Sequence, residues 1–244
     1  MRHGGSIVVC DQSMMPSGLM LPLAANSLHT QRVRSQIGVS LPRRKRVWQL
    51  IVQAKIRSQA SVLRLRCGDD AGLESLASKV RSGDPENLEA RAAQRYWPRV
   101  FEDPDFRRRR DAADQNRLLN YGYAVLRAGV ARAICSTGLH PSIGVHHKSR
   151  SNPFCLADDL MEPWRAMVDA EVAEMVGEFG PDVGLDSDSR ARLIGILHER
   201  LIDDGESRTV LDWISRSASS LASAICGDAP VGQITVFFPA GLQH

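Results

Sequence analysis

Residues 116–137 read NRLLNYGYAVLRAGVARAICST, and this stretch decides the kind of fold that the chain adopts. Its large apolar side chains recur at intervals typical of one helix with a buried face. They are Leu118, Leu119, Val125, Leu126, Val130 and Ile134. Small residues between them let neighbouring helices approach closely, and Gly138 suits the position just beyond a helix end. The stretch therefore predicts a long helix in a helical core.

Most of the remaining chain carries the same helical periodicity. We expect further helices over residues 27–40, 44–65, 86–96, 159–179, 187–202 and 207–226. Residues 98–113 are polar and arginine-rich, residues 139–154 contain prolines, and both segments are expected to be irregular. Strands are predicted at residues 6–10 and, in the tail, at residues 233–238. The predicted fold class is mainly α.

The composition favours a soluble, cytoplasmic protein. The 244 residues carry a formal net charge of +3, which is too small to indicate nucleic-acid binding by itself. Five widely spaced cysteines form no CxxC pair, so neither a zinc knuckle nor a disulfide framework is indicated. The apolar stretch at residues 7–10 is too short for a signal peptide or a membrane span.

Basic residues are concentrated in two blocks, Arg43–Arg46 and Arg107–Arg110. Such blocks are either solvated surface or contacts for the phosphates of a nucleic acid. The sequence leaves both interpretations open.

Three carboxylates are gathered in the segment LADDLMEPWR, residues 156–165. Asp159 and Glu162 are three residues apart and share one face of a predicted helix, with Pro163 indicating the helix start. Like charges on one face repel, so either a cation or a basic partner is expected to neutralise them. The alternative is ordinary capping, because acidic side chains are favourable at a helix N-terminus.

Two adjacent histidines, His146 and His147, lie in the loop that precedes these carboxylates. Loop histidines are often plain surface residues, but a histidine with two carboxylates is a donor set suited to Mg²⁺ or Mn²⁺. Such metals assist phosphodiester chemistry by stabilising charge on the transferring phosphate. A further carboxylate has to come from elsewhere, and Glu86, Glu89 and Glu102 are all candidates.

Three segments together resemble the CRISPR-associated integrase of spacer acquisition, the Cas-one family, in its type II branch. The segments are VVCDQSMMPSGLMLPL (8–23), GDPENLEARAAQRYW (83–97) and LLNYGYAVLRAGVARAICSTGLHPSIGVHHKSRSNPFCLADDLMEPWR (118–165). The resemblance covers residues 7–169 well and continues more loosely through the C-terminal helices. It implies an α-helical catalytic domain over residues 23–244, preceded by residues 1–22 as a remnant strand and linker of an N-terminal β domain.

The resemblance also implies the site residues. The metal-binding glutamate, histidine and acidic residue of the family match Glu89, His147 and Glu162, which would hold Mg²⁺ or Mn²⁺. Asp159 matches a supporting acidic position, and His146 is the second choice for the histidine ligand. The residues expected to contact DNA near the metal are Arg91, Arg95, Lys148 and Arg150.

The implied reaction inserts short DNA fragments (spacers) into a CRISPR repeat array. A 3′-hydroxyl of the fragment attacks a phosphodiester at the end of a repeat, and members can also cut DNA as metal-dependent endonucleases, a hydrolase activity of antiviral defence. The implied partners are double-stranded DNA, a small companion protein of the Cas-two family and a second copy of the chain. No membrane is involved.

The family begins with a β-rich domain, and this sequence resembles only the last part of it. A truncated N-terminus would leave the metal ligands in place but would weaken the homodimer and the assembly. One alternative is therefore an inactive remnant that still binds DNA or its partner protein. Another is an unrelated helical metal hydrolase with the same Glu, His and Glu ligands.

Overall fold

The computed structural model describes residues 7–10, 16–20, 26–109, 112 and 114–239. Helices dominate these residues, as the apolar periodicity predicts, so the mainly α fold class is confirmed. The helices are α1 (His29–Gly38), α2 (Leu41–Cys67), α3 (Leu73–Lys79), α4 (Leu88–Val100), α5 (Asn116–Ser136), α6 (Cys155–Met161), α7 (Arg165–Phe179), α8 (Ser187–Gly195) and α9 (Val210–Cys226). Three short 3₁₀ turns accompany them: η1 (Glu162–Trp164), η2 (Ile196–His198) and η3 (Val231–Gln233).

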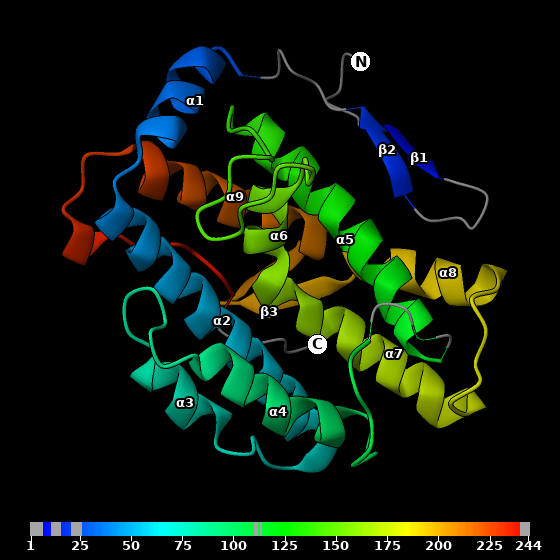
Figure 1. Ribbon diagram of the computed structural model, residues 1–244. Helices are drawn as coiled ribbons and strands as arrows, with labels where there is room; N and C mark the ends of the chain where they lie inside the picture. Colours follow the sequence, from blue (N-terminus) through cyan, green and yellow to red (C-terminus); the bar gives the residue numbers. More distant parts are fainter. Residues whose placement is uncertain (1–6, 11–15, 21–25, 110–111, 113, 240–244) are drawn as a thin grey trace.

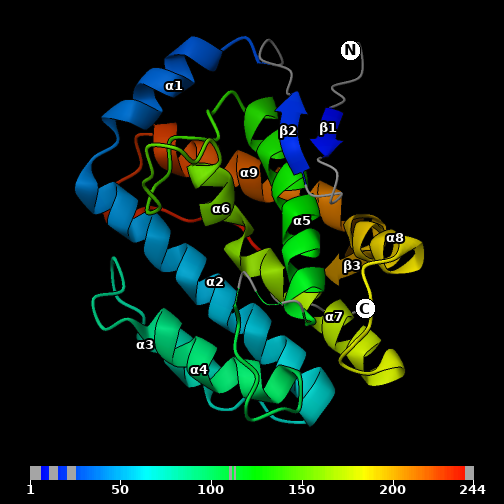
Figure 2. The same ribbon diagram turned by 45° about the vertical axis from the view of Figure 1, so that its right-hand side comes forward.

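Two long helices, α2 and α5, organise the core. α5 packs against α6, α7, α8 and α9, while α2 packs against α3, α4, η1 and α7. In both ribbon views α3 and α4 lie on one side of α2, and α6 and α7 lie on the other (Figures 1 and 2). Helix α2 can therefore present side chains to α4 and to η1 at the same time, although these two elements are far apart in the sequence.

The acidic segment spans a junction between helices, with Asp158 in the first turn of α6 and Glu162 at the start of the turn that follows it. One helix was predicted from residue 159, but α6 begins at Cys155 and ends at Met161, and the 3₁₀ turn η1 links it to α7. Pro163 lies in this turn, where a continuing α-helix would lack one N–H donor and would clash with the proline ring. Asp159 and Glu162 therefore belong to different elements.

Residues 200–209 form a hairpin that corrects the predicted helices at 187–202 and 207–226. β3 (Arg200–Asp203) pairs antiparallel with β4 (Glu206–Thr209). The two turn residues, Asp204 and Gly205, have φ angles of 48° and 76°. An Asp-Gly pair with both residues in the left-handed region is typical of a two-residue hairpin turn. Helix α8 therefore ends at Gly195, and α9 begins at Val210.

Other differences are smaller. Helix α3 was not predicted, and α4 runs past residue 96 to Val100 with Pro98 in its last turn. Residues 139–154 contain no helix or strand, as predicted. The predicted tail strand at 233–238 is wrong: Ile234 is buried in the core, and Phe237 stacks on Trp213. These apolar residues pack individually on the helical core and do not form a strand.

The predicted N-terminal strand is present as β1 (Ile7–Cys10). It pairs antiparallel with β2 (Pro16–Met20), which lies in the segment expected to be a linker. The remaining residues of 1–22, namely 1–6, 11–15 and 21–22, lie outside the described residues. Pairing with β2 satisfies backbone groups of β1 that a single strand would leave without partners.

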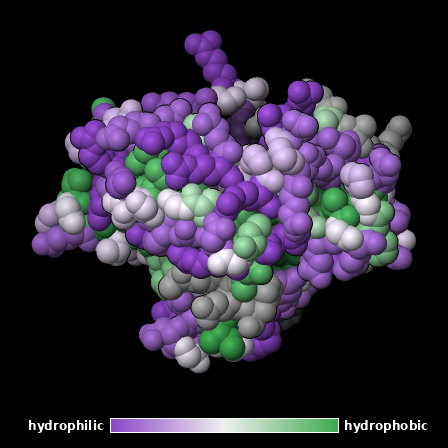
Figure 3. All heavy atoms as spheres, turned by 90° about the horizontal axis from the view of Figure 1, so that it is seen from below, coloured by the Kyte–Doolittle hydropathy of each residue, from purple (hydrophilic) through white to green (hydrophobic). Residues whose placement is uncertain are grey.

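The surface is mixed in character. Seen from below, it is mainly hydrophilic, with apolar residues in separate groups (Figure 3). None of the helices in the described part of the chain is long and apolar enough to cross a membrane.

Candidate metal centre

The loop that carries His147 is built around the carboxylate of Asp159. This buried carboxylate accepts backbone N–H bonds from Val145 at 2.7 Å and from His146 and His147 at 3.1 Å each. It also lies 2.7 Å from Nδ1 of the His147 ring. A carboxylate beside one ring nitrogen holds the ring orientation and favours a proton on that nitrogen. The other nitrogen, Nε2, is then the one left to bind a metal or a substrate.

Gly144 allows this loop to close. A Cβ atom at residue 144 would lie 2.4 Å from the carbonyl oxygen of His147 and 2.9 Å from Oδ2 of Asp159. Both distances are too short for real contacts, and the carbonyl belongs to the backbone, which cannot move aside cheaply. Any larger residue at 144 would therefore displace the histidine from Asp159.

The two predicted carboxylate ligands converge on one positive charge. Nζ of Lys55, on α2, lies 2.6 Å from Oε1 of Glu89 on α4 and 2.7 Å from Oε2 of Glu162 in η1. The other oxygen of Glu162 lies 3.0 Å from Nε of Arg165. The Lys55 and Glu162 side chains are only 15% and 7% exposed. The fold thus brings Glu89 and Glu162 together, as predicted, with a lysine between them.

The charges in this cluster keep Glu162 ionised. Burial by itself raises the pKa of Glu162, but Lys55 and then Arg165 outweigh it and bring the pKa to about 2. Burial lowers the pKa of Lys55, but the facing glutamates reverse this and raise it above its usual value. The hydrogen bond to Asp159 raises the pKa of His147, and burial opposes it. Glu162 is therefore a carboxylate at neutral pH.

The two histidines have different surroundings. The His146 ring stacks on Trp48 with centroids 4.0 Å apart and planes 6° apart, whereas the His147 ring meets Trp48 edge-on at 5.8 Å. His147 also bonds Asp159, and its ring senses the charge of Glu162. Of the two candidates, His147 is better placed to join the carboxylates as a ligand.

The side chains are not arranged around an empty metal position. Within the described residues, no three His, Cys, Asp or Glu side chains are close enough together to hold a metal ion as they stand. The donor types still fit the predicted metal, because two carboxylates and an imidazole suit Mg²⁺ or Mn²⁺. The ammonium of Lys55 is the cation that lies between the two carboxylates.

Two polar hollows meet at His147. One has a volume of about 560 Å³ and is lined by Arg108, Asn120, Tyr123, Arg127, Asp158 and Arg165, among others. The second, of about 520 Å³, is lined by Arg44, Lys148 and Arg150, among others. Since both hollows contain His147 and are rich in positive side chains, a phosphodiester chain can approach this histidine from either side.

The predicted DNA contacts occupy different positions. Lys148 and Arg150 are exposed and line a hollow beside His147. Arg91 is exposed on α4, whereas Arg95 donates to the backbone oxygen of Ala71. Arg43 in the first basic block bonds the backbone oxygens of Ala224 and Ala229. At least this member of the block fastens α2 to the end of α9, so it is neither plain solvated surface nor free for phosphate.

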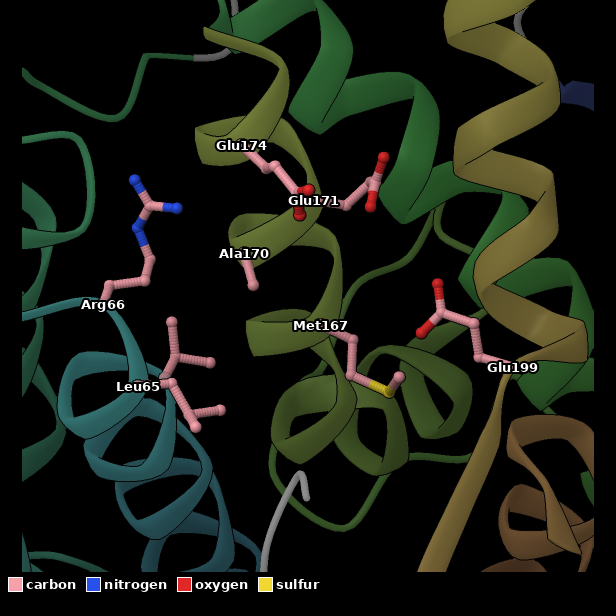
Figure 4. Close-up of a pocket in the computed structure, with 8 residues that line it drawn as sticks. Leu65, Arg66, Met167, Ala170, Glu171, Glu174 and Glu199 are labelled. Carbon is pink, nitrogen blue, oxygen red and sulfur yellow. The ribbon is translucent and has the colours of Figure 1, made fainter. Parts of the chain in front are cut away.

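A third pocket has the opposite charge. It lies between α2 and α7, has a volume of about 270 Å³ and contains Met167 and Ala170. Figure 4 shows Glu171, Glu174 and Glu199 around it, with Arg66 of α2 on the opposite side. With three carboxylates in its lining, this pocket suits a phosphate less well than the basic hollows beside His147.

Sequence reasoning did not identify Lys55 or Arg165. For Lys55 a signal was present: it lies one residue before buried Ile56 and seven residues after buried Trp48. Seven residues are about two helical turns, so Trp48 and Lys55 share a face that is mainly apolar. A lysine on a buried helix face needs a carboxylate partner, and this need could have pointed to the site.

Solved structures with this fold include a casposase and a Cas1-containing complex. A solved structure titled "Casposase bound to integration product" matches 96% of this chain and 78% of its own, with a TM-score of 0.74 and 20% identity. One titled "Cas6-RT-Cas1–Cas2 complex" matches 97% of this chain and 30% of its own, with a TM-score of 0.75 and 19% identity. At these identities the likeness shows a shared fold.

Sequence matches define the family. The model of the family described as "CRISPR associated protein Cas1" matches residues 1–179. The CRISPR-associated endonuclease Cas1 of Neisseria meningitidis serogroup C (strain 8013) is 36% identical over 226 residues, which are 92% of this chain and 74% of the relative. The chain therefore belongs to the Cas1 family, and the family predicted from the sequence is confirmed. The prediction of an enzyme is confirmed at the same level, while the metal, its ligands and the DNA contacts stay predictions.

Proposed function

We propose that this chain is a divalent-metal-dependent DNA endonuclease and integrase of CRISPR adaptation, which inserts spacers into a CRISPR repeat array. The observation that carries the proposal is the convergence of Glu89 and Glu162 on one cation position. His147 belongs to the same site, because it is oriented by Asp159 and affected by the charge of Glu162. Membership of the Cas1 family supports the class of reaction.

In this proposal Glu89, Glu162 and His147 would hold Mg²⁺ or Mn²⁺, and the Nε2 atom of His147 is the ring nitrogen that Asp159 leaves available for it. The bound cation would supply charge stabilisation for the phosphate under attack. Asp159 fixes the ring of His147, as a hydrogen-bonded carboxylate does for many metal-binding histidines. Glu162 needs no deprotonation at neutral pH, since its pKa is about 2.

DNA would reach the centre along the two basic hollows at His147. Arg108 and Arg165 line one hollow, but Arg108 already donates to Asn120 and Arg165 already forms an ion pair with Glu162. Lys148 and Arg150 are exposed in the other, so they are better candidates for phosphate contacts. Contacts of this kind hold the backbone without reading the base sequence.

The proposed partners are double-stranded DNA, a Cas2-type companion protein and a second copy of the chain. The structural relatives support the first two, because one is titled as bound to an integration product and another as a Cas1–Cas2 complex. The homodimer is proposed from the family resemblance alone.

The proposal can be tested with an integration assay. The protein, the Cas2-type companion, a short DNA duplex, a repeat-bearing plasmid and Mg²⁺ or Mn²⁺ are incubated, and strand transfer is measured. Glu89→Gln and His147→Ala are expected to abolish transfer, whereas Glu174→Gln, at the acidic pocket, serves as a matched control and should retain it. DNA binding without transfer in the wild type and in every variant would instead indicate the inactive remnant.

A further inference from the structure

The position of Lys55 calls for an explanation, because a buried lysine is costly unless its charge has a use. Its Nζ contacts one carboxylate from α4 and one from η1, at nearly equal distances of 2.6 and 2.7 Å. Each of these two carboxylates favours the charged form of the amine, so the contact is one between an ammonium ion and two glutamates. Lys55 is therefore a permanent positive charge between the two proposed ligands.

An ammonium resembles a hard metal ion in one respect: it is a compact charge that several oxygens can approach at once. A divalent cation bound to the same two carboxylate oxygens would lie within a few ångströms of Nζ if the lysine did not move. Two positive charges at such a distance in a largely buried site repel strongly. Both cations cannot keep the same contacts with Glu89 and Glu162.

We propose that the ammonium of Lys55 occupies the cation position of the metal-free enzyme and is displaced from at least one glutamate when a divalent cation binds. This inference rests on the proposed metal centre. Lys55 then has two effects: it holds the carboxylates together before metal binding, and it lowers the affinity for the metal. The Lys55 side chain is 15% exposed, so it can move toward solvent when it leaves a glutamate.

The first experiment measures Mn²⁺ binding to the full chain, with free Mn²⁺ followed by electron paramagnetic resonance. Lys55→Met removes the competing charge and keeps most of the side-chain volume, so it is expected to bind Mn²⁺ about tenfold more tightly, the factor given by about 1.4 kcal/mol. Arg57→Met is the matched control, since Arg57 lies on the same helix and pairs with Glu74 away from the site. It should leave Mn²⁺ affinity unchanged.

The second experiment needs no variant and so remains valid if Lys55→Met does not fold. The wild-type protein is acetylated briefly with and without Mn²⁺, and the modification of Lys55 is measured by mass spectrometry relative to exposed Lys79. Displacement frees the amine of Lys55 from its carboxylates, so its relative acetylation is expected to rise severalfold with Mn²⁺.

The outcomes separate this inference from the proposed metal centre. If the wild type binds Mn²⁺ and Glu89→Gln does not, the centre exists. In that case, weaker or unchanged binding by a folded Lys55→Met, or Lys55 acetylation that does not respond to Mn²⁺, overturns the displacement of Lys55 alone. If neither the wild type nor Lys55→Met binds Mn²⁺, the metal centre and this inference both fail.

Discussion

Glu162 and Asp169 are both buried carboxylates, seven residues apart on η1 and α7, yet their pKa values are shifted in opposite directions. The pKa of Glu162 is lowered to about 2, and that of Asp169 is raised to about 6. Burial raises the pKa in both cases and is the largest single cause. The difference therefore comes from the partners.

Glu162 faces two full positive charges at ion-pair distance, Lys55 and Arg165. Asp169 faces two phenols instead: Tyr96 donates at 3.1 Å, and Tyr123 donates to the other oxygen. Neutral donors stabilise a carboxylate less than an adjacent cation does, so burial dominates at Asp169. A carboxylate ready to bind metal at neutral pH thus requires nearby positive charge, and the candidate centre has it.

The largest effect is expected on catalysis. Glu162→Gln should lower strand cleavage by about 100-fold or more, because a bound metal supplies several kcal/mol and each 1.4 kcal/mol is about tenfold in rate. Asp169→Asn should change the rate by less than about tenfold, since Asp169 bonds tyrosines and not the proposed metal. Initial rates on a labelled DNA duplex in Mn²⁺ measure both. Equal losses in the two variants would contradict the distinction.

The next effect is on the pH dependence of stability. The folded-state pKa of Asp169 is about 6 against an ordinary value of 3.8, so the folded protein holds this proton more tightly than the unfolded chain. The raised pKa of Asp169 contributes at most about 3 kcal/mol to the free energy of unfolding. This contribution is fully present below the unfolded-state pKa and is lost as the pH rises through the folded-state pKa.

Asp169→Asn removes this titration. The free energy of unfolding of the wild type, relative to that of Asp169→Asn, should therefore fall between about pH 4 and about pH 6.5. Urea denaturation followed by circular dichroism at several pH values in this range provides the measurement. If the difference in free energy of unfolding between the wild type and Asp169→Asn does not vary with pH, folding does not raise the pKa of Asp169.

A smaller effect is expected when one phenol is removed. Tyr123→Phe leaves the Asp169 carboxylate with one tyrosine donor, which should cost about 1–3 kcal/mol at neutral pH. The cost should be smaller at about pH 4.5, where protonated Asp169 depends less on donors. Urea unfolding at the two pH values tests this. A cost that is larger at the lower pH would mean that Asp169 is not the group that needs the phenol.

The smallest effect is expected at an ion pair that is short but exposed. Arg81 lies 2.6 Å from Glu86, the same distance as Lys55 from Glu89, but the two side chains are 69% and 50% exposed. Arg81→Gln should change the free energy of unfolding by less than about 0.5 kcal/mol, because water screens the pair. Thermal unfolding by calorimetry is sufficient to measure it, and a clear loss of stability would show that distance matters more than burial.

Local patterns predicted the parts of this molecule that depend on neighbours in sequence. The apolar repeat in residues 116–137 predicted α5, and the Asp-Gly pair at residues 204 and 205 held an unused signal for the hairpin. Periodicity failed at Pro163, because the apolar pattern of one helix continues through a 3₁₀ turn that contains the proline.

The sequence by itself determined the helical class, the Cas1 family and the identity of Glu89, His147 and Glu162 as candidates, because these follow from short-range patterns and motif matches. Only the tertiary structure decided that Lys55 lies between two of them and that Asp159 organises the histidine loop. It also decided that the pKa of Asp169 is raised while that of Glu162 is lowered. The physical reason is that a pKa depends on charges a few ångströms away, and packing brings these from helices that are distant along the chain.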